Sequence, residues 1–153
     1  MMVMEIVILA LAALLLCANL KSIPTAFNKK KAADTSMSMR DSMLDIQKKY
    51  SMLSPQTIQA LFYAISFTLV SISIVLDIII YKTAVITTIG EISSINYIMI
   101  ISMFTHFYFL ITTIIDTFRV NVKITGYGMT IENIAANIFY LASVVSLLSK
   151  IIS

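Results

Sequence analysis

Charged residues are scarce in this sequence of 153 residues. Asp, Glu, Lys and Arg together make up 12% of it, whereas hydrophobic residues make up 59%. Ordinary soluble domains contain about 25% charged and about 45 to 50% apolar residues. A water-soluble fold of this length does not bury so much apolar surface. We therefore expect an integral membrane protein that forms a single membrane domain over residues 1–153.

Cysteine and histidine each occur once, as Cys17 and His106. A lone cysteine excludes an internal disulfide and a cysteine-based metal cluster. One histidine among scattered carboxylates does not supply clustered ligands, so we predict no metal site and no cofactor. The sequence also lacks the HExxH, GxSxG, phosphate-loop and CxxC motifs. We expect a protein that is not an enzyme.

Four apolar segments approach the length of a membrane span. A helix needs about 20 apolar residues to cross the hydrocarbon core, because its backbone groups must all be bonded within the segment. The segments cover residues 3–20, 58–81, 95–115 and 131–148. Ser54 and Pro55 supply an N-cap and a first-turn proline for the second of them. The predicted fold is all-α, a polytopic bundle of four transmembrane helices.

The first segment is open to a second interpretation, a cleaved signal peptide, which would leave three transmembrane helices. Residues 6–18 have the length of a signal-peptide core, but the start carries Glu5 and lacks Lys and Arg. Leu16 and Ala18 also form a poor cleavage site. We expect an uncleaved membrane anchor.

Basic residues are distributed unevenly between the loops. With four spans, the loops at residues 21–56 and 116–130 lie on the same side of the membrane. They hold nine basic residues, which are Lys21, Lys29, Lys30, Lys31, Arg40, Lys48, Lys49, Arg119 and Lys123. Lys82 and Lys150 lie elsewhere. Because basic residues favour the cytoplasmic side, we predict that these loops are cytoplasmic and that both termini lie outside.

The first long loop contains a predicted amphipathic helix at about residues 35–53. Apolar residues recur there at spacings of three and four. They are Met39, Met43, Ile46, Tyr50 and Leu53. With Lys29, Lys30 and Lys31 ahead of it, this helix is expected to lie on the membrane surface. A partner-binding helix is the alternative, because Met side chains adapt to irregular surfaces.

The net charge of +3 raises the question of nucleic-acid binding. The basic residues are concentrated beside apolar segments, where anionic lipid headgroups are the nearer partners. We therefore expect contact with the lipid bilayer and not with nucleic acid.

Polar residues inside three of the spans recur at helical spacing. Polar groups at membrane depth are expensive and usually face other helices or a cavity. The stripes are Gln59, Tyr63, Ser66, Val70, Ser73 and Asp77; Ser102, His106, Phe109, Thr113 and Asp116; and Asn133, Ala136, Asn137, Tyr140 and Ser143. We expect the second, third and fourth helices to pack on these faces. The first helix lacks such a stripe and is expected at the periphery or against another protein.

Asp77 and His106 each allow two interpretations. Asp77 is either an interfacial carboxylate, exposed to water or paired with Lys82, or a protonatable group that couples ion movement to transport. His106 is either a neutral imidazole bonded to a hydroxyl or carbonyl, or a proton relay. The simpler interpretation is favoured for both residues.

Two functions follow from these patterns. The first is a non-catalytic membrane protein that acts through helix contacts with another membrane protein, as an accessory subunit, assembly factor, or inhibitor or immunity-type protein. The second is a small transporter or channel that uses Asp77 and His106, assembled as a homo-oligomer because four short helices enclose little space. The absence of catalytic motifs and the packable polar faces favour the first.

Overall fold

A computed structural model describes residues 2–26, 45–46, 48–50, 52, 54–85, 87–88, 91–92, 94–118 and 126–152. The described part contains four long helices: α1 (Met2–Ala26), α3 (Pro55–Ala84), α4 (Ser94–Phe118) and α5 (Gly126–Ile152). Each is long and apolar enough to cross a membrane, as in a multi-pass membrane protein. The four predicted helices are confirmed. Every one extends beyond its predicted apolar segment, because helical hydrogen bonding continues into the flanking polar residues.

Local signals define the start of α3 and the turn after it. The Ser54 side chain accepts a hydrogen bond from the Thr57 backbone N–H at 3.1 Å, and Pro55 occupies the first helical position, as predicted. After α3, the short strands β1 (Thr87–Thr88) and β2 (Glu91–Ile92) pair antiparallel. This hairpin was not predicted. It reverses the chain between α3 and α4.

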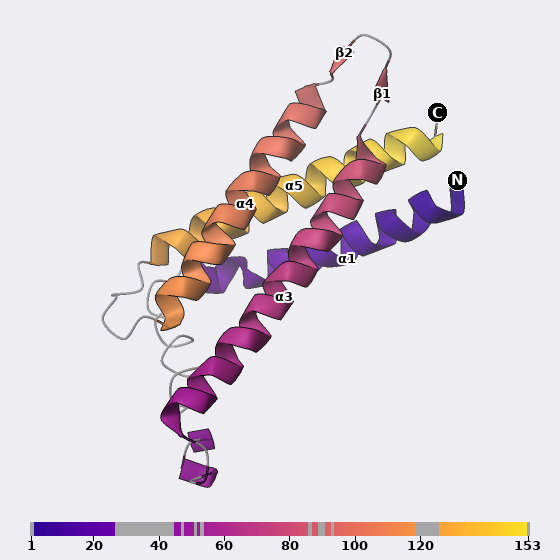
Figure 1. The fold of residues 1–153 in the computed structure, drawn as a ribbon. Coiled ribbons are helices and arrows are strands. Elements are labelled where there is room, and N and C mark those ends of the chain that lie inside the picture. Colours follow the sequence, from indigo (N-terminus) through magenta and orange to yellow (C-terminus); the bar gives the residue numbers. More distant parts are fainter. Residues whose placement is uncertain are drawn as a thin grey trace.

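Helix α5 is the centre of the bundle. Helices α4 and α1 pack along it extensively, whereas α3 makes fewer contacts with α4 and α5 (Figure 1). Helix α1 lies at the edge of the bundle, as predicted, but it is attached along its length to α5. Ala12 of α1 and Ala136 of α5 are both fully buried in the same core, where small side chains allow helix backbones to approach closely.

The two ends of the bundle carry different parts of the chain. The first residues of α1, the last residues of α5 and the β1–β2 hairpin lie at one end (Figure 1). The last residues of α1 and α4 and the first residues of α5 lie at the other end. Successive long helices therefore run in opposite directions between the two ends, as expected if each of the four crosses the membrane once.

Side chains near the end of α5 cap the end of α3. Ser146 donates a hydrogen bond to the backbone carbonyl of Ala84, and the Lys150 ammonium donates one to the carbonyl of Thr83 at 2.7 Å. The last carbonyls of a helix lack partners within it and favour a nearby positive charge. These bonds fix the end of α3 against α5.

Most of the predicted amphipathic helix, with Lys29, Lys30, Lys31, Met39 and Met43, lies outside the described residues. Among the described ones, the Tyr50 backbone N–H bonds to the Ile46 carbonyl at 2.9 Å, which closes one helical turn. Ile46 is partly buried and Tyr50 is exposed. An exposed ion pair joins Asp45 and Lys48 at 3.9 Å.

Candidate functional site: a buried ionic cluster

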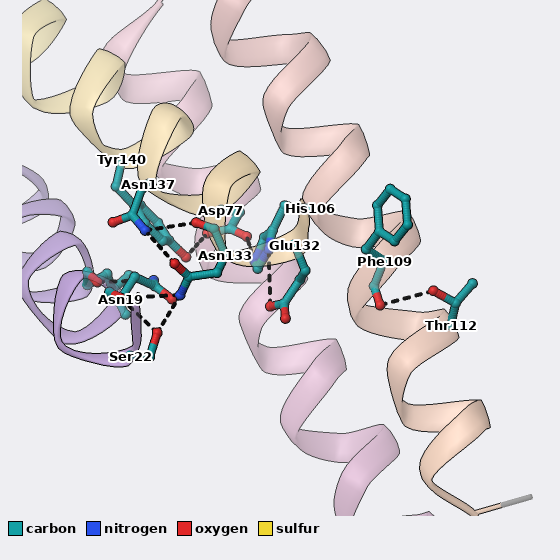
Figure 2. Close-up of polar contacts among 11 residues, drawn as sticks. Asn19, Ser22, Asp77, His106, Phe109, Thr112, Glu132, Asn133, Asn137 and Tyr140 are labelled. Atoms are coloured by element: carbon teal, nitrogen blue, oxygen red, sulfur yellow. Dashed lines mark hydrogen bonds and ion pairs between the residues drawn. The ribbon is translucent and has the colours of Figure 1, made fainter. Parts of the chain in front are cut away.

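Ionisable side chains from three helices meet inside the bundle. Asp77 comes from α3, His106 from α4, and Glu132 and Tyr140 from α5 (Figure 2). We call these residues the ionic cluster. The central position of α5 explains the meeting, because α5 packs against both α3 and α4 and presents Glu132 and Tyr140 two helical turns apart on one face.

Asp77 is fully buried, at 0% exposure. Its Oδ1 accepts a hydrogen bond from the Tyr140 hydroxyl at 2.7 Å, and its Oδ2 lies 3.6 Å from His106 Nε2. Lys82 is exposed at the end of α3. The interpretation of Asp77 as exposed to water or paired with Lys82 is therefore wrong: its carboxylate faces α4 and α5, and its partners come from those helices.

The depth of Asp77 follows from the offset of α3 relative to its neighbours. Asp77 lies well past the middle of α3, which had suggested a position near the membrane surface. His106 and Tyr140, however, lie near the middle of α4 and α5. The first turns of α3 extend beyond the ends of those helices (Figure 1), so Asp77 lies level with the middle of α4 and α5 although it is well past the middle of α3.

His106 lies between two carboxylates. Its Nε2 faces Asp77, and its Nδ1 lies 3.5 Å from Glu132 Oε1. These distances exceed those of ordinary hydrogen bonds, about 2.7 to 3.2 Å. Neither ring nitrogen, nor Asp77 Oδ2, makes a hydrogen bond within the described part of the chain.

The charges of the ionic cluster do not balance. With a neutral imidazole and both carboxylates ionised, the cluster carries two negative charges, and protonation of His106 removes only one. Among the described residues, His106 is the basic group within 4.0 Å of either carboxylate. Uncompensated charge inside a membrane is costly. The cluster therefore has the chemistry to take up a further proton or a cation.

Glu132 was absent from the predicted polar stripes. Its side chain is 18% exposed and completes the contact with His106. Glu132, Ala136 and Tyr140 recur at spacings of four, which places Glu132 on the face that also carries the predicted Tyr140. Glu132 was missed because it is the second residue of the predicted segment 131–148. Carboxylates are common at the ends of membrane spans, so its position in the sequence did not indicate that this one lies in the interior.

An amide network joins α1 to α5 beside the ionic cluster. Asn133 Nδ2 donates to the Asn19 carbonyl at 3.2 Å and to the Ser22 hydroxyl. Asn137 Nδ2 in turn donates to the Asn133 carbonyl at 2.8 Å (Figure 2). Cross-helix bonds of this kind contribute about 0.6 to 2 kcal/mol each in membranes. They explain why α1 is held along α5 although it lacks a polar stripe of its own.

The other predicted polar residues have separate positions. Ser102 is buried and bonds to the Ile98 carbonyl of its own helix at 2.6 Å. Ser66 and Ser73 are partly buried on α3. Thr113 belongs to α4, but its side chain lies outside the described ones. Of the sixteen residues in the predicted stripes, Asp77, His106 and Tyr140 meet in the ionic cluster, and Asn133 and Asn137 meet in the amide network.

Among the described residues, no group of three or more His, Cys, Asp or Glu side chains is arranged to hold a metal ion. His106 separates the two carboxylates of the ionic cluster, so the three do not converge on one point. Comparison with protein families, curated proteins and solved structures finds no match for this chain. A proposal of function therefore depends on the geometry of the ionic cluster.

Proposed function

We propose that this protein is a small membrane transporter or channel that moves an ion through the ionic cluster. The supporting observation is that Asp77, His106 and Glu132 approach one another from three helices, with polar atoms left unbonded. Ionisable groups inside membranes are rare and commonly mark ion pathways or proton relays. Helices can pack through hydroxyl and amide groups alone, as the amide network between α1 and α5 illustrates. Ionisable groups are therefore not required for packing.

The working unit is proposed to be a homo-oligomer. Four helices enclose little space, and their interior here is filled by side chains such as Phe139, Tyr140 and Leu147. A second copy of the chain would extend the polar path beyond a single bundle.

Reconstitution of the purified full-length protein into liposomes tests this function. Dyes sensitive to H⁺, Na⁺ and K⁺ would be enclosed, and flux would be started by a concentration gradient or a membrane potential. We expect flux of at least one cation above that of empty vesicles, and a homo-oligomer by light scattering in detergent. Well-folded, inserted protein that moves none of these ions would contradict the proposal.

The proposed orientation has both termini outside and the loops at residues 21–56 and 116–130 in the cytoplasm. The excess of basic residues in these loops supports it. The amphipathic segment at about residues 35–53, with Lys29, Lys30 and Lys31, is proposed to lie on the inner membrane surface.

Cysteine labelling in intact cells checks this orientation. In a Cys17→Ala background, a membrane-impermeant thiol reagent should label Gly90→Cys and should spare Lys30→Cys until the membrane is opened. The reason is that the two positions lie in loops on opposite sides of the proposed threading. Labelling of position 30 alone would reverse the orientation.

A contact protein, acting on another membrane protein, is the second candidate. The first turns of α3 favour it, because they extend past α4 and α5 and expose Gln56, Leu61 and Ile65 (Figure 1). Purification from native membranes in mild detergent, followed by mass spectrometry, tests this function. A stoichiometric membrane partner would favour it, whereas a homo-oligomer without companions would favour the transporter or channel.

A further inference from the structure

The two ring nitrogens of His106 face carboxylates on different helices. Nε2 lies 3.6 Å from Asp77 Oδ2 on α3, and Nδ1 lies 3.5 Å from Glu132 Oε1 on α5. Imidazole is the side chain that takes up a proton at one nitrogen while it releases another from the second. A carboxylate beside each nitrogen supplies both a donor and an acceptor for such a transfer.

Tyr140 orients the Asp77 carboxyl group for this exchange. Its hydroxyl donates to Oδ1 at 2.7 Å, which leaves Oδ2 directed at the imidazole (Figure 2). Asp77 is 0% exposed, the His106 side chain is 5% exposed, and Oδ2, Nε2 and Nδ1 make no hydrogen bond to any described residue. The atoms without partners are therefore the atoms that a proton would visit in turn.

We propose that the ion handled by the ionic cluster is the proton, and that His106 relays it between Asp77 and Glu132. This inference rests on the proposed function and specifies its ion. In the transfer, the O–H bond of protonated Asp77 breaks as an N–H bond forms at Nε2. The N–H bond at Nδ1 breaks as an O–H bond forms at Glu132 Oε1.

The transfer is balanced in atoms and charge. Asp77 ends as a carboxylate, Glu132 ends as a carboxylic acid, and His106 remains neutral but exchanges one tautomer for the other. Rotation of the ring, which carries the protonated nitrogen from the Asp77 side to the Glu132 side, resets the relay once Asp77 has regained a proton and Glu132 has released one. The present separations require the groups to approach hydrogen-bond distance, or one water to bridge them, before a proton moves.

Polar side chains continue on the hairpin side of the cluster. Ser102 lies one helical turn from His106 on α4, and Ser143 lies one turn beyond Tyr140 on α5. Both are buried, and so is Ser146, one turn further along α5. Glu132, near the start of α5, is partly exposed, with 18% of its side-chain surface accessible. Asp77, His106 and Glu132 therefore form the middle and one end of a polar line along the bundle.

Proton flux into liposomes with an enclosed pH-sensitive dye tests the relay. Relative to wild type, His106→Ala and Glu132→Gln should each lower proton flux by about tenfold or more, because each removes one transfer step. Added imidazole should restore part of the flux in His106→Ala, which a purely structural role would not allow. Thr68→Val is the matched control, because Thr68 is exposed and donates to the Ala64 carbonyl of its own helix.

A spectroscopic measurement keeps the inference testable if a variant fails to fold. His106 is the only histidine, so ¹⁵N-histidine labelling of the wild-type protein reports on this ring alone. We expect both tautomers to be populated and to exchange. A single fixed tautomer across the accessible pH range would overturn the relay.

The outcomes separate this inference from the proposed function. Flux of Na⁺ or K⁺ without proton flux would overturn the relay and leave the transporter or channel in place. Wild-type proton flux in folded His106→Ala would also overturn the relay. The absence of any cation flux would contradict the proposed function itself.

Discussion

Replacement of Asp77 by Asn is expected to reduce ion flux in liposomes by about tenfold or more while the bundle remains assembled. The amide oxygen of Asn can still accept the hydrogen bond that Tyr140 donates to Oδ1, so the contact between α3 and α5 is retained. The substitution removes the negative charge and the ability to gain and lose a proton. Flux measurements on protein of matched abundance would check this prediction.

Asp45→Asn is the matched control, because it makes the same chemical change at an exposed carboxylate whose ion-pair partner, Lys48, is also exposed. We expect Asp45→Asn to retain wild-type flux, since exposed ion pairs contribute little. Undiminished flux in a correctly inserted Asp77→Asn protein would remove Asp77 from the ion pathway. If Asp77→Asn also left the capture of a membrane partner unchanged, the contact-protein candidate would gain support.

Replacement of Ala12 by Leu is expected to separate α1 from α5. Ala12 is fully buried, and extra methylene groups in a close-packed site typically cost about 1 to 3 kcal/mol, because neighbouring side chains and backbones must move. The same displacement would strain the nearby bonds from Asn133 to Asn19 and Ser22. Thermal unfolding in detergent should show a lower midpoint than for wild type.

Ala10→Leu provides the corresponding control on the same helix. Ala10 is exposed and lies two residues before Ala12, on a different side of α1. We expect Ala10→Leu to unfold near the wild-type midpoint. Equal midpoints for Ala12→Leu and wild type would show that α1 packs less closely on α5 than the structure indicates.

Hydropathy was sufficient to find the four helices. The predicted segments 3–20, 58–81, 95–115 and 131–148 all lie within the observed α1, α3, α4 and α5. The underlying physics is local, because a continuous apolar segment of this length satisfies its backbone groups only as a helix in a membrane. The termini of the helices extended further because hydropathy does not report where helical hydrogen bonding stops.

Helical periodicity also identified much of the interior. On α4 and α5, Ser102, His106, Asn133, Tyr140 and Ser143 are all buried, as their spacing predicted. On α3 the agreement is partial, because Val70 and Asp77 are buried whereas Tyr63 is 40% exposed. A stripe on one helix predicts a buried face only where another helix reaches it.

The sequence by itself therefore determined the all-helical fold, the number and approximate limits of the long apolar helices, and the faces that carry polar groups. Only the tertiary structure decided which helices meet and at what depth. It placed α1 along α5 through Asn133, and it brought Asp77 to the level of His106 because α3 is offset along its axis. It also added Glu132 to their site. The physical reason is that helix formation and hydropathy depend on neighbours along the chain, whereas the pairing, offset and rotation of helices depend on side chains distant in sequence.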